Sequence, residues 1–171
     1  MVQRIGVLGT LGIALWAIAL LAFIAGPAAA QDWTRHRNAR FGFAIDYPRD
    51  LLRPLPPPVN NDGRKFESAD RSVTLMVYAG HNVMNDTIRK LYRAALAEHG
   101  GAVSYKAARR EYFVVSGAGG GRIFYRVSIR YRRAGADLLA HMRLDYAASA
   151  RERVDPLIGR MFRSFRASVG R

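Results

Sequence analysis

Two stretches of strictly alternating residues constrain the fold of this chain most. Residues 123–131 and 138–146 each place apolar side chains at every second position, which is typical of strands with one buried face. Both apolar sets must face the core, so the parity of the strand pairing is determined. A two-residue type II′ turn at Gly135-Ala136 satisfies this parity and pairs Ile129 with Met142 and Arg126 with Asp145. We therefore predict a long antiparallel hairpin.

The rest of the chain predicts shorter elements around this hairpin. Alternation predicts strands at residues 41–47, 64–68, 73–78, 103–107 and 112–116. Apolar spacing predicts a helix over 88–96, capped by Asn85 or Asp86 and closed by Gly100. A second helix follows the capping box Ser149–Glu152, and Pro156 either kinks it or marks a fresh start.

The fold class is α+β, with a mainly antiparallel sheet of about six to seven strands flanked by two main helices. The side chains expected to be largely buried are Phe41, Phe43, Val127, Ile129, Met142, Leu144, Leu157 and Phe162.

The first 30 residues have the three-part pattern of a secretory signal peptide. Arg4 precedes an uncharged apolar run over 5–24, and Ala28-Ala29-Ala30 offers small residues for cleavage after Ala30. The run is also long enough to remain as an uncleaved membrane anchor. We expect a periplasmic or secreted protein, or alternatively a membrane-anchored one facing outside the cytoplasm. Residues 31–39 are expected to form a flexible leader, and residues 40–167 a single globular domain.

Short motifs distributed over the chain resemble PsbP-like domains and the related Mog-type Ran-binding proteins. They are Phe41-Gly42-Phe43 followed by Tyr47-Pro48, then the segment 113–117, the strand ending at Tyr146, and the closing Ser164-Phe165-Arg166. The resemblance covers roughly residues 38–167 and implies an antiparallel sheet flanked by helices. It also implies a non-enzymatic binding or accessory domain, as in an exported bacterial member of the family. No residue of this chain can be matched to the photosystem-binding or Ran-binding roles of particular family members.

Residues for catalysis and for cofactor or metal binding are sparse. The chain contains no cysteine, and its four histidines lack the spacing of metal ligands, so we expect no metal and no cofactor. The glycine-rich loop 117–121 opens a strand rather than a helix, which argues against phosphate binding. The alternative to a non-enzymatic domain is a small secreted hydrolase whose site is assembled from Ser116, His141 and Asp145. A second alternative is a membrane-tethered structural protein.

Positive charge is the remaining signal. The 171 residues carry 27 Lys and Arg against 13 Asp and Glu, and 24 of the basic residues are arginine. This bias is explained either by a GC-rich genome or by an anionic partner.

On the polar face of the hairpin we expect Asp145 to neutralise only Arg126, so that the other arginines lack an acidic partner there. The candidate binding residues are Arg126, Arg130, Arg132 and Arg143. The partner would be an anionic envelope component or an acidic protein. Nucleic acid is a less suitable partner outside the cytoplasm, and an uncleaved N-terminus would add a membrane contact.

Overall fold

The computed structural model describes residues 31–167 of the chain. The described residues from Asp32 onward belong to one compact unit, and both hydrophobic clusters described below lie within it. The predicted signal peptide, its cleavage after Ala30 and the alternative membrane anchor lie outside the described residues. Within residues 31–167, no helix has the length and apolar character needed to cross a membrane.

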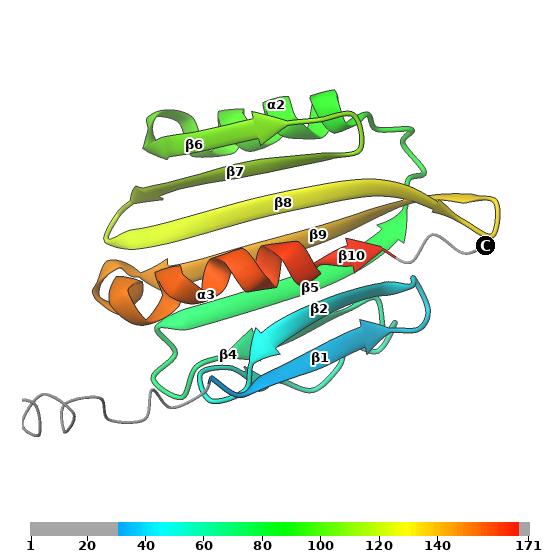
Figure 1. The fold of residues 1–171 in the computed structure, drawn as a ribbon. Coiled ribbons are helices and arrows are strands. Elements are labelled where there is room, and N and C mark those ends of the chain that lie inside the picture. Colours follow the sequence, from blue (N-terminus) through cyan, green and yellow to red (C-terminus); the bar gives the residue numbers. More distant parts are fainter. Residues whose placement is uncertain (1–30, 168–171) are drawn as a thin grey trace, which may run out of the picture. The chain divides into compact units, whose positions relative to one another are not determined.

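The centre of the fold is a seven-stranded antiparallel sheet (Figure 1). Its strand order is β3-β4-β5-β9-β8-β7-β6. The sequence predicted β4, β5, β6 and β7 to within a few residues and the hairpin β8–β9 at nearly full length, while the two-residue edge strand β3 was not predicted. The strands are β3 (Arg53–Pro54), β4 (Gly63–Glu67), β5 (Val73–His81), β6 (Val103–Ala108), β7 (Tyr112–Gly119), β8 (Arg122–Arg133) and β9 (Ala136–Ala147).

A second sheet has three strands in the order β1-β2-β10, and it corrects the expectation of a flexible leader. Strand β1 (Trp33–Asn38) pairs along its whole length with β2 (Phe43–Pro48), while β10 (Arg166–Ala167) lies on the other side of β2. Asn38 is buried, and its side chain accepts a hydrogen bond from the Phe41 amide at 2.9 Å and donates one to the Asn61 carbonyl at 2.9 Å. Strand β1 lacks alternating aliphatic residues, which is why its sequence did not indicate a strand.

Two helices cover opposite faces of the large sheet. Helix α2 (Ile88–His99) packs on β7 and β8 through a cluster that contains Ile88, Ala95, Phe113, Val115 and Phe124. Helix α3 (Arg151–Ser164) joins the small sheet in the larger cluster on the other face. The architecture is thus an α+β sandwich, as predicted.

The ends of the helices differ from the predicted caps. Helix α2 is capped by Thr87, whose side chain accepts from the Lys90 amide at 3.1 Å, and not by Asn85 or Asp86; it ends at Gly100 as expected. The capping box at Ser149 does not form, because residues 148–150 make a short 3-10 turn before α3 and Ala150 is the N-cap. Helix α3 runs through Pro156 without a fresh start at Asp155.

The hairpin β8–β9 has the predicted parity, but each residue of β8 pairs two residues earlier on β9 than predicted. The turn lies at Ala134-Gly135, whose φ values of 48° and 81° are those of a type I′ turn, rather than at Gly135-Ala136. Val127 therefore pairs with Met142, and Ile129 pairs with Ala140. Because a shift of this size keeps the parity, each side chain remains on its predicted face.

The predicted core is largely confirmed. Phe41, Phe43, Val127, Met142 and Leu144 are each at most 4% exposed. Ile129, Leu157 and Phe162 are half-buried and pack against the same cluster, so the prediction of nearly complete burial was wrong for these three.

The loop within the glycine-rich segment 117–121 is shorter than expected. Strand β7 extends to Gly119, and only Gly120-Gly121 form the turn to β8. Gly117 lies inside the strand, where a Cβ atom would be 1.9 Å from the carbonyl oxygen of Ala102. A glycine is therefore needed for the close approach of the segment that follows α2.

Candidate functional site

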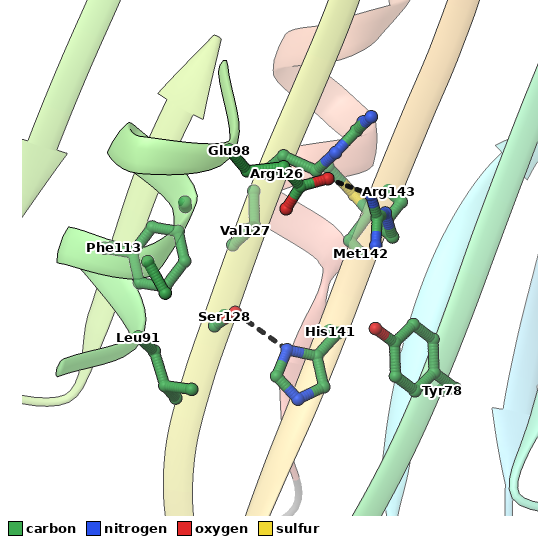
Figure 2. Close-up of a pocket in the computed structure, with 12 residues that line it drawn as sticks. Tyr78, Leu91, Glu98, Phe113, Arg126, Val127, Ser128, His141, Met142 and Arg143 are labelled. Atoms are coloured by element: carbon green, nitrogen blue, oxygen red, sulfur yellow. Dashed lines mark hydrogen bonds and ion pairs between the residues drawn. The ribbon is translucent and has the colours of Figure 1, made fainter. Parts of the chain in front are cut away.

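A pocket of about 170 Å³ lies between helix α2 and the sheet, above strands β8, β9 and β5 (Figure 2). Leu91, Ala94, Ala95 and Glu98 of α2 form one wall. The sheet supplies the opposite wall and most of the polar groups, which are those of Tyr78, Arg126, Ser128, His141 and Arg143. The pocket thus contains two of the four candidate arginines and the candidate histidine.

Ser128 and His141 are hydrogen-bonded partners in this pocket. The Ser128 hydroxyl lies 2.7 Å from Nδ1 of His141, and Tyr78 stacks on the imidazole with ring centroids 4.9 Å apart (Figure 2). Burial, with a smaller contribution from the positive charge of Arg143, lowers the pKa of His141 to about 4. The imidazole is therefore neutral at physiological pH, and it forms an uncharged pair with the serine.

Arg126 is held deep beside the pocket by Asp145. Its side chain is 11% exposed, and its two terminal nitrogens donate to the two carboxylate oxygens at 2.7 and 3.1 Å. The predicted Arg126–Asp145 interaction therefore exists, but it is a diagonal one, because Arg126 pairs directly with Arg143 across the strands. Nε of Arg126 is buried without a hydrogen-bond partner.

Arg143 lies at the exposed rim of the pocket. Its Nη2 donates to Glu98 of α2 at 2.8 Å, and the side chain is 36% exposed (Figure 2). Burial works against the charge on Arg143, but Glu98 and Tyr78 outweigh this effect, so the pKa of the guanidinium lies above its ordinary value. Glu98 belongs to a different element, so the hairpin sequence alone did not indicate this pairing.

Arg130 and Arg132 lie nearer the β8–β9 turn, away from the pocket lining. Arg130 donates to both oxygens of Asp137 at 2.7–3.2 Å, and this contact lowers the pKa of the carboxyl. Arg132 donates to the carbonyl of Gly135 at 3.0 Å. The expectation that Arg130, Arg132 and Arg143 lack an acidic partner in the hairpin is therefore wrong for Arg130, whereas the carboxylate that pairs with Arg143 belongs to α2. Among the candidate arginines, only Arg132 has no ion pair with a carboxylate of residues 31–167.

The proposed hydrolase residues do not converge. Ser116 lies on β7 with its side chain on the same face as Val114, which belongs to the cluster below α3. His141 lies on β9, on the α2 face, and β8 separates the two strands. Neighbouring strands are about 4.8 Å apart, so Ser116 is beyond hydrogen-bond reach of His141 and is separated from it by the sheet. Asp145 is engaged by Arg126, so this catalytic interpretation is wrong.

The pocket also lacks the donor set of a metal site. Within residues 31–167, no three side chains of His, Asp or Glu are grouped so that they would hold an ion. The residues that line the pocket instead offer hydrogen-bond donors from Arg143, Ser128 and Tyr78, together with one carboxylate from Glu98. Such an arrangement is suited to binding a polar or acidic group rather than a cation.

The α+β sandwich of this chain is similar in fold to solved structures of other proteins. The Ran-binding protein Mog1p of Saccharomyces cerevisiae matches with a TM-score of 0.51 and 11% identity, over 81% of this chain and 96% of that one. A point mutant of Mog1 matches with a TM-score of 0.49 and 9% identity, over 81% of this chain and 97% of that one. LpqN of Mycobacterium tuberculosis, involved in cell envelope biogenesis, matches with a TM-score of 0.48 and 14% identity, over 76% of this chain and 87% of that one.

The likeness to Mog1p supports the fold implied by the sequence resemblance, and the fold alone. No protein-family model matches the chain, and no curated protein matches it. Membership of the PsbP-like family therefore remains a prediction.

Sequence reasoning missed the two residues that complete the pocket. Glu98 was assigned to a helix without a role, and Tyr78 to the end of a strand. The parity of β8 and β9 did place Ser128 and His141 on one face, which was the available signal for their pairing.

Proposed function

We propose that this chain is an exported, non-enzymatic binding domain that recognises an acidic group of a partner through the pocket beneath α2. The observation that carries the proposal is the position of Arg143 at the rim. Its guanidinium has five N–H donors, and the contact with Glu98 is made by Nη2. The remaining donors, together with Tyr78, offer a charged site to a carboxylate or a phosphate at the entrance of the pocket.

The chemistry of the pocket favours binding over catalysis. The Ser128–His141 pair uses Nδ1 of the imidazole, and the low pKa of His141 makes it a weak base near neutral pH. The two carboxylates near this pair, Glu98 and Asp145, are engaged by Arg143 and Arg126. An activated nucleophile needs a base that is itself oriented by a third group, and here both carboxylates serve arginines instead.

Arg126 has a different role in this proposal from Arg143. Its bidentate contact with Asp145 and its burial make it a support for the pocket floor rather than a direct ligand. Arg130 is likewise engaged by Asp137. Among the predicted binding residues, Arg143 is thus the centre of the proposed pocket site.

The test is a pull-down from the native envelope with the wild-type domain and an Arg143→Gln variant, followed by mass spectrometry. We expect the variant to lose the partner, with an affinity reduced by about tenfold or more, because a charge-assisted hydrogen bond is removed. An Arg93→Gln variant removes the same charge from the exposed side of α2 and should retain the partner.

Retention of the same partner by Arg143→Gln would contradict the proposed site. Hydrolysis of model esters that disappears in a Ser128→Ala variant would contradict the non-enzymatic assignment. N-terminal sequencing of the native protein tests export separately, since cleavage after Ala30 leaves Gln31 as the first residue.

A further inference from the structure

One end of the large sheet presents exposed aliphatic side chains on two loops. Val59 is fully exposed, Val83 is 80% exposed and Met84 is 72% exposed. Within residues 31–167, the other large apolar side chains with high exposure are Met76 and Tyr105, which lie inside strands β5 and β6. The apolar side chains of the loops are therefore concentrated at one end of the sheet.

Hydrogen bonds hold both loops against this end. The amide of Asn82 donates to the carbonyl of Asp137 at 2.9 Å, and the buried Asn82 side chain bonds both the amide and the carbonyl of Asp86. In the other loop, the Asp62 carbonyl accepts from Ala79 at 2.9 Å. The aliphatic side chains are thus displayed by an ordered backbone.

The same end is rich in arginine. Two turns at this end carry Arg40, Arg109 and Arg110, and the last residues of β8 add Arg130, Arg132 and Arg133. The carboxylates of this end are Asp62, Asp86, Glu111 and Asp137. Three of them are engaged, because Asp86 pairs with Lys90, Glu111 with Arg110 and Asp137 with Arg130.

The other arginines of this end are bonded to backbone carbonyls. Arg133 donates to the carbonyls of Ala39 and Arg40 at 2.9 and 3.0 Å, and Arg40 donates to that of Asn60. Arg109 and Arg132 donate to the carbonyls of Ala108 and Gly135. These contacts orient the guanidinium groups without neutralising their charge.

We propose that this end, which we call the loop end, docks on a bilayer that contains anionic lipid. Val59, Val83 and Met84 enter the interface between headgroups and acyl chains, while the arginines contact lipid phosphates. A protein interface of this kind would have a contiguous apolar core, whereas here the apolar side chains stand on two separate loops among arginines. The loop end is distinct from the Arg143 pocket, so this inference does not rest on the proposed function.

The experiment measures vesicle binding by residues 31–171. This part contains both hydrophobic clusters and excludes any contact through residues 1–30. The protein is co-sedimented with vesicles of phosphatidylcholine, with and without phosphatidylglycerol, at low and at physiological salt. We expect binding to the anionic vesicles that weakens as salt screens the charges.

Two double variants test the two components of the loop end. In Arg109→Gln/Arg132→Gln, we expect affinity for anionic vesicles to fall about fivefold for each charge. In Val83→Ser/Met84→Ser, we expect a loss of about tenfold or more, because apolar side chains leave the interface. The matched controls are Arg122→Gln, at the start of β8 at the opposite end of the sheet, and Met76→Ser, inside β5; both should bind as the wild type does.

Equal binding to neutral and anionic vesicles would overturn the proposal, as would unchanged binding by either double variant. Capture of an acidic protein without any vesicle binding would also overturn it and assign the loop end to a protein partner. The Arg143→Gln variant separates the pocket proposal from the loop-end proposal. It should bind vesicles as the wild type does even if it no longer captures the partner in the pull-down.

Discussion

At the scale of single residues, the polar groups beneath α2 are arranged so that each charge meets an opposite charge and the histidine stays neutral. Arg126 and Arg143 are adjacent across β8 and β9, and two like charges at this spacing repel each other. Asp145 and Glu98 offset this repulsion from two different elements. His141, close to Arg143, remains uncharged because protonation would add a third positive charge in a buried position.

The state of His141 predicts a pH dependence of stability. Its pKa is about 4 in the folded protein against an ordinary value of 6.5, so the unfolded chain binds the proton more tightly. The free energy of unfolding should therefore fall as the pH drops below about 6.5, with a loss of about 2–3 kcal/mol by about pH 4.5. Burial lowers the pKa values of His36 and His99 as well, so they act in the same direction.

Urea unfolding of the wild type and of His141→Gln at several pH values measures the contribution of His141. The variant should show a shallower decline in the free energy of unfolding over this range, whatever its absolute stability. An identical decline in the two proteins would mean that His141 is not buried as described.

At the scale of elements, the hairpin β8–β9 shows that parity and register are determined by different features. The alternating side chains decide which face each residue occupies, but several turns satisfy the same parity. The turn that forms has Ala134 at φ 48°, a conformation that disfavours alanine, next to Gly135 at φ 81°. The sequence Ala-Gly is thus a suboptimal version of a type I′ turn, for which Asn-Gly is preferred.

An Ala134→Asn variant tests this register. Asparagine tolerates positive φ better than alanine, so we expect the free energy of unfolding to rise by about 0.5–1 kcal/mol. Thermal or urea unfolding measures the change. Had the turn been at Gly135-Ala136, position 134 would lie in the strand, where asparagine is disfavoured and would lower the stability. An Ala148→Asn substitution, at an exposed position outside the hairpin, controls for a general effect of the residue.

At the scale of the whole molecule, the small sheet β1-β2-β10 and helix α3 cover one face of the large sheet. Strand β2 places Phe43 and Ile45 in the main cluster, and Phe165, between α3 and β10, is fully buried there. Strand β1 protects the edge of β2, and the His36 ring contacts Phe43 and Phe66 with centroids 6.1 and 5.7 Å apart. The segment expected to be a flexible leader is therefore part of the folded domain.

Truncation tests the role of β1. A chain that begins at Arg40 should lose at least about 2 kcal/mol of unfolding free energy relative to one that begins at Gln31, because the β2 edge and apolar surface of Phe43 become exposed. Chemical denaturation of the two chains measures the difference. Equal midpoints would return residues 31–39 to the role of a leader.

Much of the architecture was predictable from local patterns. Side-chain alternation identified most of the large sheet, and apolar spacing identified both helices, because these periods reflect which side of an element is buried. The contact between Arg126 and Asp145 was also predictable, since both lie on the polar face of adjoining strands and the long arginine side chain still reaches the carboxylate when the register shifts by two residues. Strand β1 was not predictable in this way, because its inward side chains, Thr34, His36 and Asn38, are not aliphatic.

The sequence by itself determined which residues face each side of the sheet, and the tertiary structure decided which of them meet. Local periodicity carries no information on how α2 packs across β8 and β9, so the meeting of Arg143 with Glu98 follows only from the assembled fold. The same holds for the loop end. Residues from turns that are distant in the sequence come together there because antiparallel strands return to the same end of the sheet. Charge pairing and surface exposure depend on these long-range contacts, and so does the site.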